Sequence, residues 1–412
     1  MGCYPINLRT DINQKGVLSI TPSFLIGISE FAFLFRTSVV NSLILSSSSI
    51  FIYICAVMNA LIIVPLVLYV IWMHNKAIKF DVIFLIVFNC LLFWGTLQLN
   101  PAYSSLYFDS HTGNGGSMDI YSKIFNLFSS AFMGYLLVRI DENNDHFYRV
   151  LVLSCRIKFL LSFWQYRMQE DYMSFGYEMA LIAVVLLASY FTEKKKLDLL
   201  LSVVSIIEGF AFGSRGCIFG YLAFCVFASF VIDKKVITWK NTAIIAVGFL
   251  AYILMSSNAF IAWLLTKLDS LNLSSRSLQM FISGDYMNDN ARLNIWQECI
   301  NAIRNHSIFY GYGTYGDRYV LWNGRYYAHN IILEVILTFG LLFGIIAIGI
   351  FVYYLLHAYR KGTFLDKVFI SACACFALCR LFISSSFWYE KILFILIALC
   401  VNKVKEKKEL NR

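Results

Sequence analysis

Long apolar runs separated by short polar connections extend along almost the whole chain. Each run is long enough to cross about 30 Å of hydrocarbon as a helix. The pattern predicts an all-α polytopic integral membrane protein, with a single membrane domain at residues 1–412 and about 12 transmembrane helices. The predicted spans are residues 18–38, 50–72, 82–100, 119–139, 149–165, 175–192, 197–213, 216–232, 242–264, 329–356, 367–386 and 389–402.

The polar connections differ in charge, and this difference orients the predicted helices. Lysine and arginine gather in the cytoplasmic loops of membrane proteins. If both termini are cytoplasmic, every basic connection falls on the cytoplasmic side. These connections are HNKAIK (74–79), RIDENNDHFYR (139–149), TEKKK (192–196), DKKVITWK (233–240), YRKGTFLDK (359–367) and the tail KVKEKK (403–408).

Composition agrees with a membrane protein. Hydrophobic residues make up 59% of the chain and charged residues only 14%, whereas soluble domains carry about 25% charge. The net charge of +9 follows from the basic connections, and no basic stripe interleaved with aromatics suggests a nucleic-acid partner. No His/Cys cluster has zinc spacing, so we predict no metal and no cofactor. The run DENND (141–145) resembles a metal-carboxylate run, but we expect a solvated turn there.

One loop is much longer than the others. Residues 266–328 separate the ninth and tenth predicted spans on the side opposite the cytoplasm, and a loop of this length usually has a function. Within it, Leu293, Trp296, Ile300 and Ile303 fall on one face of a predicted amphipathic helix. The run FYGYGTYGDR (309–318) follows, and its glycines suit a tight loop that a ligand approaches closely. We therefore predict a periplasmic loop with short helices of its own.

Polar residues stand where the tenth span begins. His329 and Asn330 open the segment AHNIILEVILTFGLLFG, and Glu334 lies one turn inside it. Histidine titrates near neutrality and can act as a general base. The alternative is that His329 and Asn330 only cap the first N–H groups of the helix. Gly340 and Gly344 form a GxxxG pattern that indicates close helix packing.

Three arginines are candidates for binding an anion. Arg215 lies in GSRG between the seventh and eighth predicted spans, and Arg292 opens the predicted loop helix. A guanidinium can bind a phosphate with two parallel hydrogen bonds. Arg380, near Ser384 to Ser386, could line the same cavity. The alternatives are that Arg215 contacts lipid headgroups, Arg292 is solvated, and Arg380 extends to the membrane surface.

The order of these segments resembles the superfamily of bacterial O-antigen polymerases and O-antigen ligases, and an O-antigen polymerase most of all. The resemblance covers about residues 202–354, and this chain lacks the proline that the family usually has before the glycine turn. The matching positions are Arg215, Arg292, Trp296, Gly311, Gly313, His329, Asn330, Gly340 and Gly344.

The resemblance implies a metal-independent glycosyltransferase of lipopolysaccharide biosynthesis in the bacterial inner membrane. It would join undecaprenyl-pyrophosphate-linked oligosaccharides at the periplasmic face, with a chain-length regulator protein as partner. Arg215 and Arg292 would hold the pyrophosphate, and His329 would be the general base with Glu334 in reserve. The residues expected to bind substrate or shape the site are Trp296, Gly311, Gly313, Asn330 and Arg380.

Other functions remain open at this point. An O-antigen ligase would transfer the glycan to the lipid A core, and it differs from a polymerase only in its acceptor. Polymerases of capsules or exopolysaccharides share the same motifs. A lipid-oligosaccharide flippase or other transporter would instead favour paired halves, charges along a central pathway and short loops. The long patterned loop argues against transport.

Overall fold

The computed structural model describes most of the chain, and every element in the described part is helical. The described residues are 21–42, 49–73, 79–99, 127–168, 172–213, 216–228, 258–270, 275, 278–279, 282–283, 292–321 and 327–410. The all-α prediction is confirmed for this part. Most of the ninth predicted span, residues 242–264, lies outside it.

The helices of the first half are α1 (Pro22–Ser42), α2 (Ser49–Trp72), α3 (Phe80–Leu99), the π-helix η1 (Leu127–Phe132), α6 (Met133–Asp141), α7 (Asn144–Met168), α8 (Tyr172–Glu193), α9 (Lys196–Phe212) and α10 (Cys217–Phe227). Those of the second half are α12 (Asn258–Ser270), α14 (Arg292–Arg304), α15 (Gly316–Val320), α16 (Ile331–Phe339), α17 (Leu341–Lys361), α18 (Phe364–Ile383) and α19 (Lys391–Leu410).

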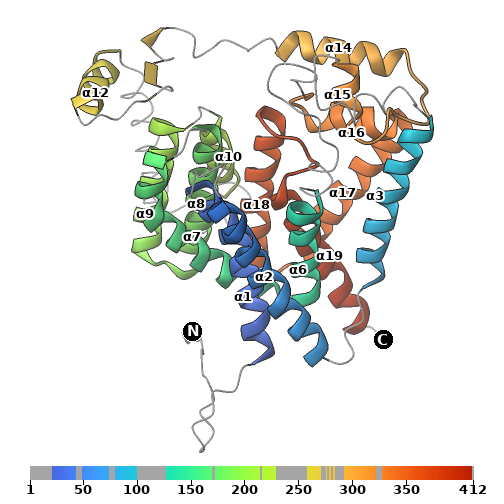
Figure 1. The fold of residues 1–412 in the computed structure, drawn as a ribbon, viewed down its shortest axis with the longest axis horizontal. Coiled ribbons are helices and arrows are strands. Elements are labelled where there is room, and N and C mark those ends of the chain that lie inside the picture. The colour runs from blue at the N-terminus through green and yellow to red at the C-terminus, as the bar shows by residue number, and fades with distance from the viewer. Residues whose placement is uncertain are drawn as a thin grey trace, which may run out of the picture.

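The loop helices α14 and α15 lie at one end of the helical bundle, together with α16 (Figure 1). Figure 1 shows α14, α15 and α16 gathered there, above α17 and α3. The C-terminal end of α19 lies at the opposite end of the bundle (Figure 1). This arrangement gives the molecule two distinct ends, and the predicted site residues of the long loop belong to only one of them.

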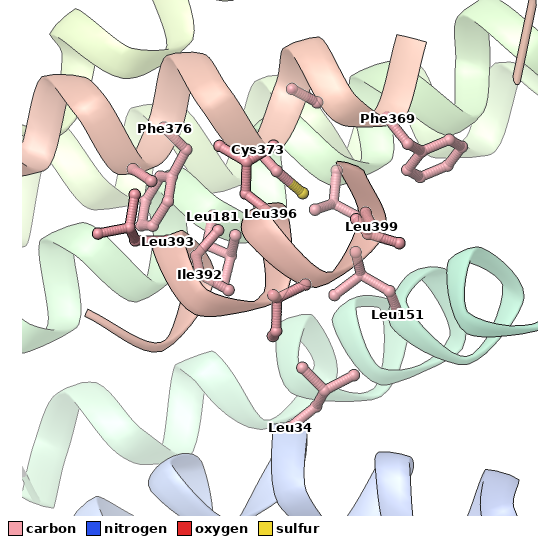
Figure 2. Packing of buried hydrophobic residues seen from close by; sticks show 14 of the residues in the cluster. Leu34, Leu151, Leu181, Phe369, Cys373, Phe376, Ile392, Leu393, Leu396 and Leu399 are labelled. Atoms are coloured by element: carbon pink, nitrogen blue, oxygen red, sulfur yellow. The ribbon is translucent and has the colours of Figure 1, made fainter. Parts of the chain in front are cut away.

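The core of the bundle surrounds α8. In α8 an 18-residue apolar window is 89% buried, whereas the corresponding windows of α3 and α17 are only 11% buried. Figure 2 shows how leucines of α1, α7, α8 and α19 pack with Phe369 and Phe376 of α18. Because α3 and α17 are apolar and yet exposed, their outer faces suit contact with lipid tails rather than water.

Three described helices are long and apolar enough to cross a membrane: residues 80–98, 173–193 and 341–361. They correspond to the third, sixth and tenth predicted spans. These helices are consistent with a helical membrane protein. The number of twelve spans and the cytoplasmic placement of both termini stay predictions.

The tenth span is not the continuous helix that the sequence predicted over residues 329–356. Gly340 has φ +85° and ψ 166°, which ends α16 and starts α17 in a new direction. A side chain at Gly344 would lie 2.9 Å from the Cα of Ile336. The close packing expected from the GxxxG pattern therefore joins the two parts of this broken segment.

Candidate functional site

The break at Gly340 is stabilised by the backbone of the long loop. The N–H groups of Tyr312 and Gly313 donate to the carbonyls of Leu337 and Thr338, at 2.7 and 3.1 Å. Another bond at the break joins the Leu342 N–H to the Ile308 carbonyl at 2.9 Å. Helix ends leave backbone groups without intrahelical partners. The glycine loop supplies those partners and is thereby fixed against α16 and α17.

Gly311 and Gly313, the two loop glycines predicted to shape the site, lie where the loop backbone comes very close to another helix. A Cβ on Gly311 would collide with the Leu337 carbonyl oxygen, and one on Gly313 would collide with the side chain of Thr96 in α3. Gly313 also has φ +84°, a conformation that favours glycine. These glycines therefore let the loop pack closely on α16 and α3, which is a site-shaping role.

Replacing Gly313 by alanine should lower the melting temperature of the purified protein in detergent. The added methyl group meets Thr96 and forces alanine into a left-handed conformation, which costs roughly 1–2 kcal/mol before any clash is counted. Gly349→Ala in α17 is the matched control, because its Cβ would meet nothing within 4 Å. Equal melting temperatures for the two variants would contradict this account of the loop.

His329 is held in place by contacts of the two residues that precede it. The indole N–H of Trp296 donates to the Ala328 carbonyl at 3.0 Å, and the Ala328 N–H donates to Asp317 at 3.0 Å. The ring of Tyr327 lies 4.0 Å from the imidazole, centroid to centroid. With φ +49°, His329 adopts a backbone conformation that is uncommon for a non-glycine residue. Strained residues of this kind cluster at functional sites.

The imidazole of His329 has one nitrogen engaged. Its Nδ1 lies 3.2 Å from the carbonyl oxygen of Ile383, at the end of α18. A carbonyl only accepts hydrogen bonds, so the neutral ring carries its proton on Nδ1 and keeps a lone pair on Nε2. His329 precedes α16 and is partly exposed. The Nε2 atom is therefore the atom of this residue that can accept a proton.

Burial and two arginines favour the neutral form of the His329 imidazole. Burial, followed by the positive charge of Arg292, lowers the pKa of His329 to about 4. Arg318 acts in the same direction, whereas Asp317 opposes it. The ring is consequently neutral at physiological pH and available as a base.

The three described arginines near this position differ in whether an acidic side chain neutralises their positive charge. Arg318 is buried, forms an ion pair with Asp317 at 3.1 Å, and lies over three tyrosine rings. Arg380 pairs with Glu390 at 3.0 Å and lies over the ring of Tyr177. Within the described part of the chain, no ion pair is recorded for Arg292. Arg292, at the start of α14, is therefore the best placed of the three to meet an anionic ligand.

Asn330 and Glu334 have contacts that organise the site. The side chain of Asn330 accepts hydrogen bonds from the N–H groups of Ile332 and Leu333, so it caps α16, as one of the two alternatives predicted. The buried carboxylate of Glu334 accepts from the Ser386 hydroxyl and from the Phe387 N–H, the latter at 3.0 Å. Glu334 thus fixes the turn that follows α18.

The contacts of Glu334 predict different effects for two substitutions. Glu334→Gln should retain most activity, because its carbonyl can accept from Phe387 and the Ser386 hydroxyl can accept from its amide. Glu334→Ala should destabilise the protein by about 1–3 kcal/mol, because Phe387 loses its acceptor. The rate of glycan transfer and the melting temperature of each variant test these two expectations. If Glu334→Gln melts normally but is inactive, Glu334 acts as an acid or base and the positioning role is wrong.

Arg215 lies outside the described residues. The glycine that follows it is described, and a Cβ on Gly216 would lie 3.0 Å from the side chain of Ile383. The carbonyl of Ile383 is the partner of His329. The chain next to Arg215 therefore reaches the same end of α18 as His329, although the predicted role of Arg215 stays a prediction.

The structure brings Arg292, Trp296, His329 and the turn after Arg380 to one end of the bundle, together with residues that the sequence did not single out. Asp317 and Arg318 form a buried ion pair that holds Ala328 and several tyrosines. In the sequence, these two residues could have been identified as an adjacent pair of opposite charges within the glycine-rich run 309–318. Tyr327, whose hydroxyl donates to the Ser384 carbonyl, also lay in the quoted sequence without a role.

These observations define a class: a helical membrane protein with a neutral histidine and arginines at one end of its bundle. The comparison with protein families is more specific, because residues 200–349 match the family model described as O-Antigen ligase. This match confirms the O-antigen polymerase and ligase superfamily for that part of the chain. Comparisons with curated proteins and with solved structures give no match.

Proposed function

We propose that the chain is an O-antigen polymerase. It joins undecaprenyl-pyrophosphate-linked oligosaccharide repeat units into polysaccharide at the periplasmic face of the bacterial inner membrane. The observation that carries the proposal is the partly exposed imidazole of His329, whose Nδ1 is held by the Ile383 carbonyl and whose pKa responds to the charge of Arg292. The match of residues 200–349 supports a polymerase- or ligase-type activity.

In the proposed reaction His329 is the general base. Its Nε2 takes the proton of a sugar hydroxyl on the acceptor repeat unit. The hydroxyl oxygen then attacks the anomeric carbon of the donor glycan and forms the new glycosidic bond. A pKa of about 4 keeps the imidazole in its basic form throughout the physiological range. The contacts of Ala328 to Trp296 and Asp317 keep this nitrogen at a fixed position.

The arginines serve the leaving group. The bond between the anomeric carbon and the pyrophosphate oxygen breaks, and undecaprenyl pyrophosphate leaves with the electron pair. Charge develops on its phosphate oxygens, and a preorganised guanidinium stabilises such charge strongly in a site of low dielectric. Arg292 has this role, with Arg215 as its partner on the strength of the family resemblance. The arrangement requires no metal ion at the transfer site.

An O-antigen ligase is the second candidate, because the matching family is described by that name. The donor chemistry would be identical, with the same roles for His329 and Arg292. Only the acceptor differs, being a hydroxyl of the lipid A core. A chain-length regulator protein is the partner expected for a polymerase and not for a ligase.

A lipopolysaccharide gel distinguishes these functions. The gene is deleted in the native host, and the strain is complemented with the wild-type gene or with a His329→Asn variant. A core bearing a single repeat unit, with the ladder lost, is the result expected for a polymerase. A core without any repeat, together with accumulated lipid-linked polymer, would identify a ligase. A core without repeats and without lipid-linked polymer at the outer face would indicate a flippase.

A further inference from the structure

A second polar cluster lies where α1, α6 and α7 meet. It consists of Glu30 in α1, Asp141 at the end of α6 and His146 in the first turn of α7. One ligand atom from each residue lies within 4.8 Å of the other two. The His146 Nδ1 is 3.0 Å from an Asp141 oxygen and 3.6 Å from a Glu30 oxygen. The side chain of Asp141 is only 7% exposed, so the solvated turn expected from the sequence includes the exposed Glu142 and Asn143 but not this residue.

Glu30 is the unusual member of the cluster. Its side chain is completely buried, and neither carboxylate oxygen has a hydrogen-bond partner in the described part of the chain. A buried carboxylate without a partner is costly, and buried charges in proteins are paired or coordinate metals. A second carboxylate, that of Asp141, adds repulsion. Unless His146 or one of the carboxylates carries an extra proton, two carboxylates and an imidazole converge here with no positive charge to balance them.

The spacing of the ligand atoms fits a transition-metal ion. Bonds of about 2.0–2.2 Å in a tetrahedral site place neighbouring ligand atoms roughly 3.3–3.6 Å apart. The distance of 3.6 Å lies at the top of this range, and that of 3.0 Å, which is also a hydrogen-bond distance between His146 and Asp141, lies just below it. Imidazole combined with carboxylates suits zinc or manganese, whereas magnesium and calcium prefer sites made of oxygen alone.

The surrounding chain is shaped to hold the histidine ring against α1. Gly27 lies one turn before Glu30, and a Cβ there would be only 3.3 Å from the Cε1 of His146. The Asn143 side chain accepts a hydrogen bond from the His146 N–H at 3.1 Å, which fixes the start of α7. His146 is 25% exposed, so an ion can enter from the surface and keep a water molecule as its fourth ligand.

We propose that Glu30, Asp141 and His146 bind one divalent zinc or manganese ion that fastens α1 to α6 and α7. The site is separate from the transfer site. Arg139, two residues before Asp141, contacts Asn402 in the C-terminal part of α19. Figure 1 shows the end of α19 opposite to α14, α15 and α16. The proposal is therefore independent of the proposed glycan transfer.

The test measures bound metal and thermal stability on the full chain purified in detergent without a histidine tag. Mass spectrometry of the wild type should find about one zinc or manganese ion per chain. After treatment with a chelator, added zinc or manganese chloride should raise the melting temperature by several degrees, because an ion that binds only the folded state stabilises it. Magnesium and calcium chloride should have no such effect.

Glu30→Gln should lose both the ion and the shift in melting temperature. Glu142→Gln is the matched control, since it removes a negative charge from the same connection at a residue that pairs with Lys79 instead. If Glu30→Gln expresses poorly, His146→Asn at the partly exposed ligand serves in its place. Equal metal content and equal shifts in wild type, cluster variant and control would overturn the proposal. So would a wild type that neither contains nor responds to zinc or manganese, because Glu30 and Asp141 would then share a proton.

Discussion

His329→Asn should abolish polymerisation while leaving the protein folded. Removing a positioned general base lowers the rate by typically 10²–10⁴-fold. Asparagine tolerates the left-handed backbone conformation of this position, and its amide can still donate to the Ile383 carbonyl. It has no second basic nitrogen to take a proton. The rate of glycan transfer by the purified protein, measured beside its melting temperature, gives the result.

His329→Ala is the companion variant, because it removes the base and also the contacts to Ile383 and Tyr327. It should be inactive and less stable than His329→Asn. Transfer by His329→Asn at the wild-type rate would contradict the general-base role. The imidazole would then only orient the acceptor.

The pKa of His329 sets the pH dependence that this role requires. The base must be unprotonated, so kcat/KM should fall as the pH drops through about 4 and should show no inflection near 6.5. With the pyrophosphate bound, its negative charge favours the imidazolium form, and the inflection in kcat should move to higher pH. A profile of kcat/KM with an inflection near 6.5 would contradict the buried, arginine-flanked environment.

The lowered pKa of His329 also makes the folding stability of the protein depend on pH. In the unfolded chain the histidine has an ordinary pKa near 6.5, and in the folded protein it is about 4. The unfolded state therefore binds more protons between these values. The contribution of His329 to stability is complete above about pH 6.5 and is lost as the pH falls toward 4.

Arg292→Ala should lower kcat/KM by on the order of 10²–10³-fold, as does the loss of one donor to a developing oxyanion in other enzymes. Arg292→Lys should recover only part of the rate, because an ammonium is a point charge and cannot form two parallel bonds to a phosphate. Transfer by the purified variants with a lipid-linked repeat unit checks both.

Arg304→Ala is the control for Arg292, since it removes an exposed arginine from the last turn of the same helix. It should have the wild-type rate. If Arg292→Ala and Arg304→Ala had the same activity, the pyrophosphate would be bound elsewhere, and Arg215 and Arg380 would be the next residues to test.

Hydropathy predicted the helices better than it predicted where they break. The apolar runs of α2, α3 and α8 lie within a few residues of their predicted bounds, because their length and composition leave little alternative in a membrane. The break at Gly340 was missed because an apolar run that contains glycine looks continuous in sequence. It is stabilised by backbone bonds to Tyr312 and Gly313, and a pattern of side chains cannot reveal such bonds.

The sequence predicted some residues of the candidate site but not the contacts between them. His329, Arg292 and Trp296 were identified as polar or family-matching residues at unusual positions. The predicted apolar face of α14 was partly wrong, because Leu293 is exposed and Ile295 and Cys299 are buried against the loop. The roles of pairs separated by many residues required the structure.

The most direct test of the account uses purified wild-type protein and the His329→Asn variant in liposomes, with the native undecaprenyl-pyrophosphate-linked repeat unit as both donor and acceptor. Wild type should form longer lipid-linked chains and release undecaprenyl pyrophosphate, whereas the variant should do neither. Chain growth by the variant at the wild-type rate would contradict the role of His329. A wild type that transfers glycan only after lipid A core is added would contradict the polymerase and identify a ligase.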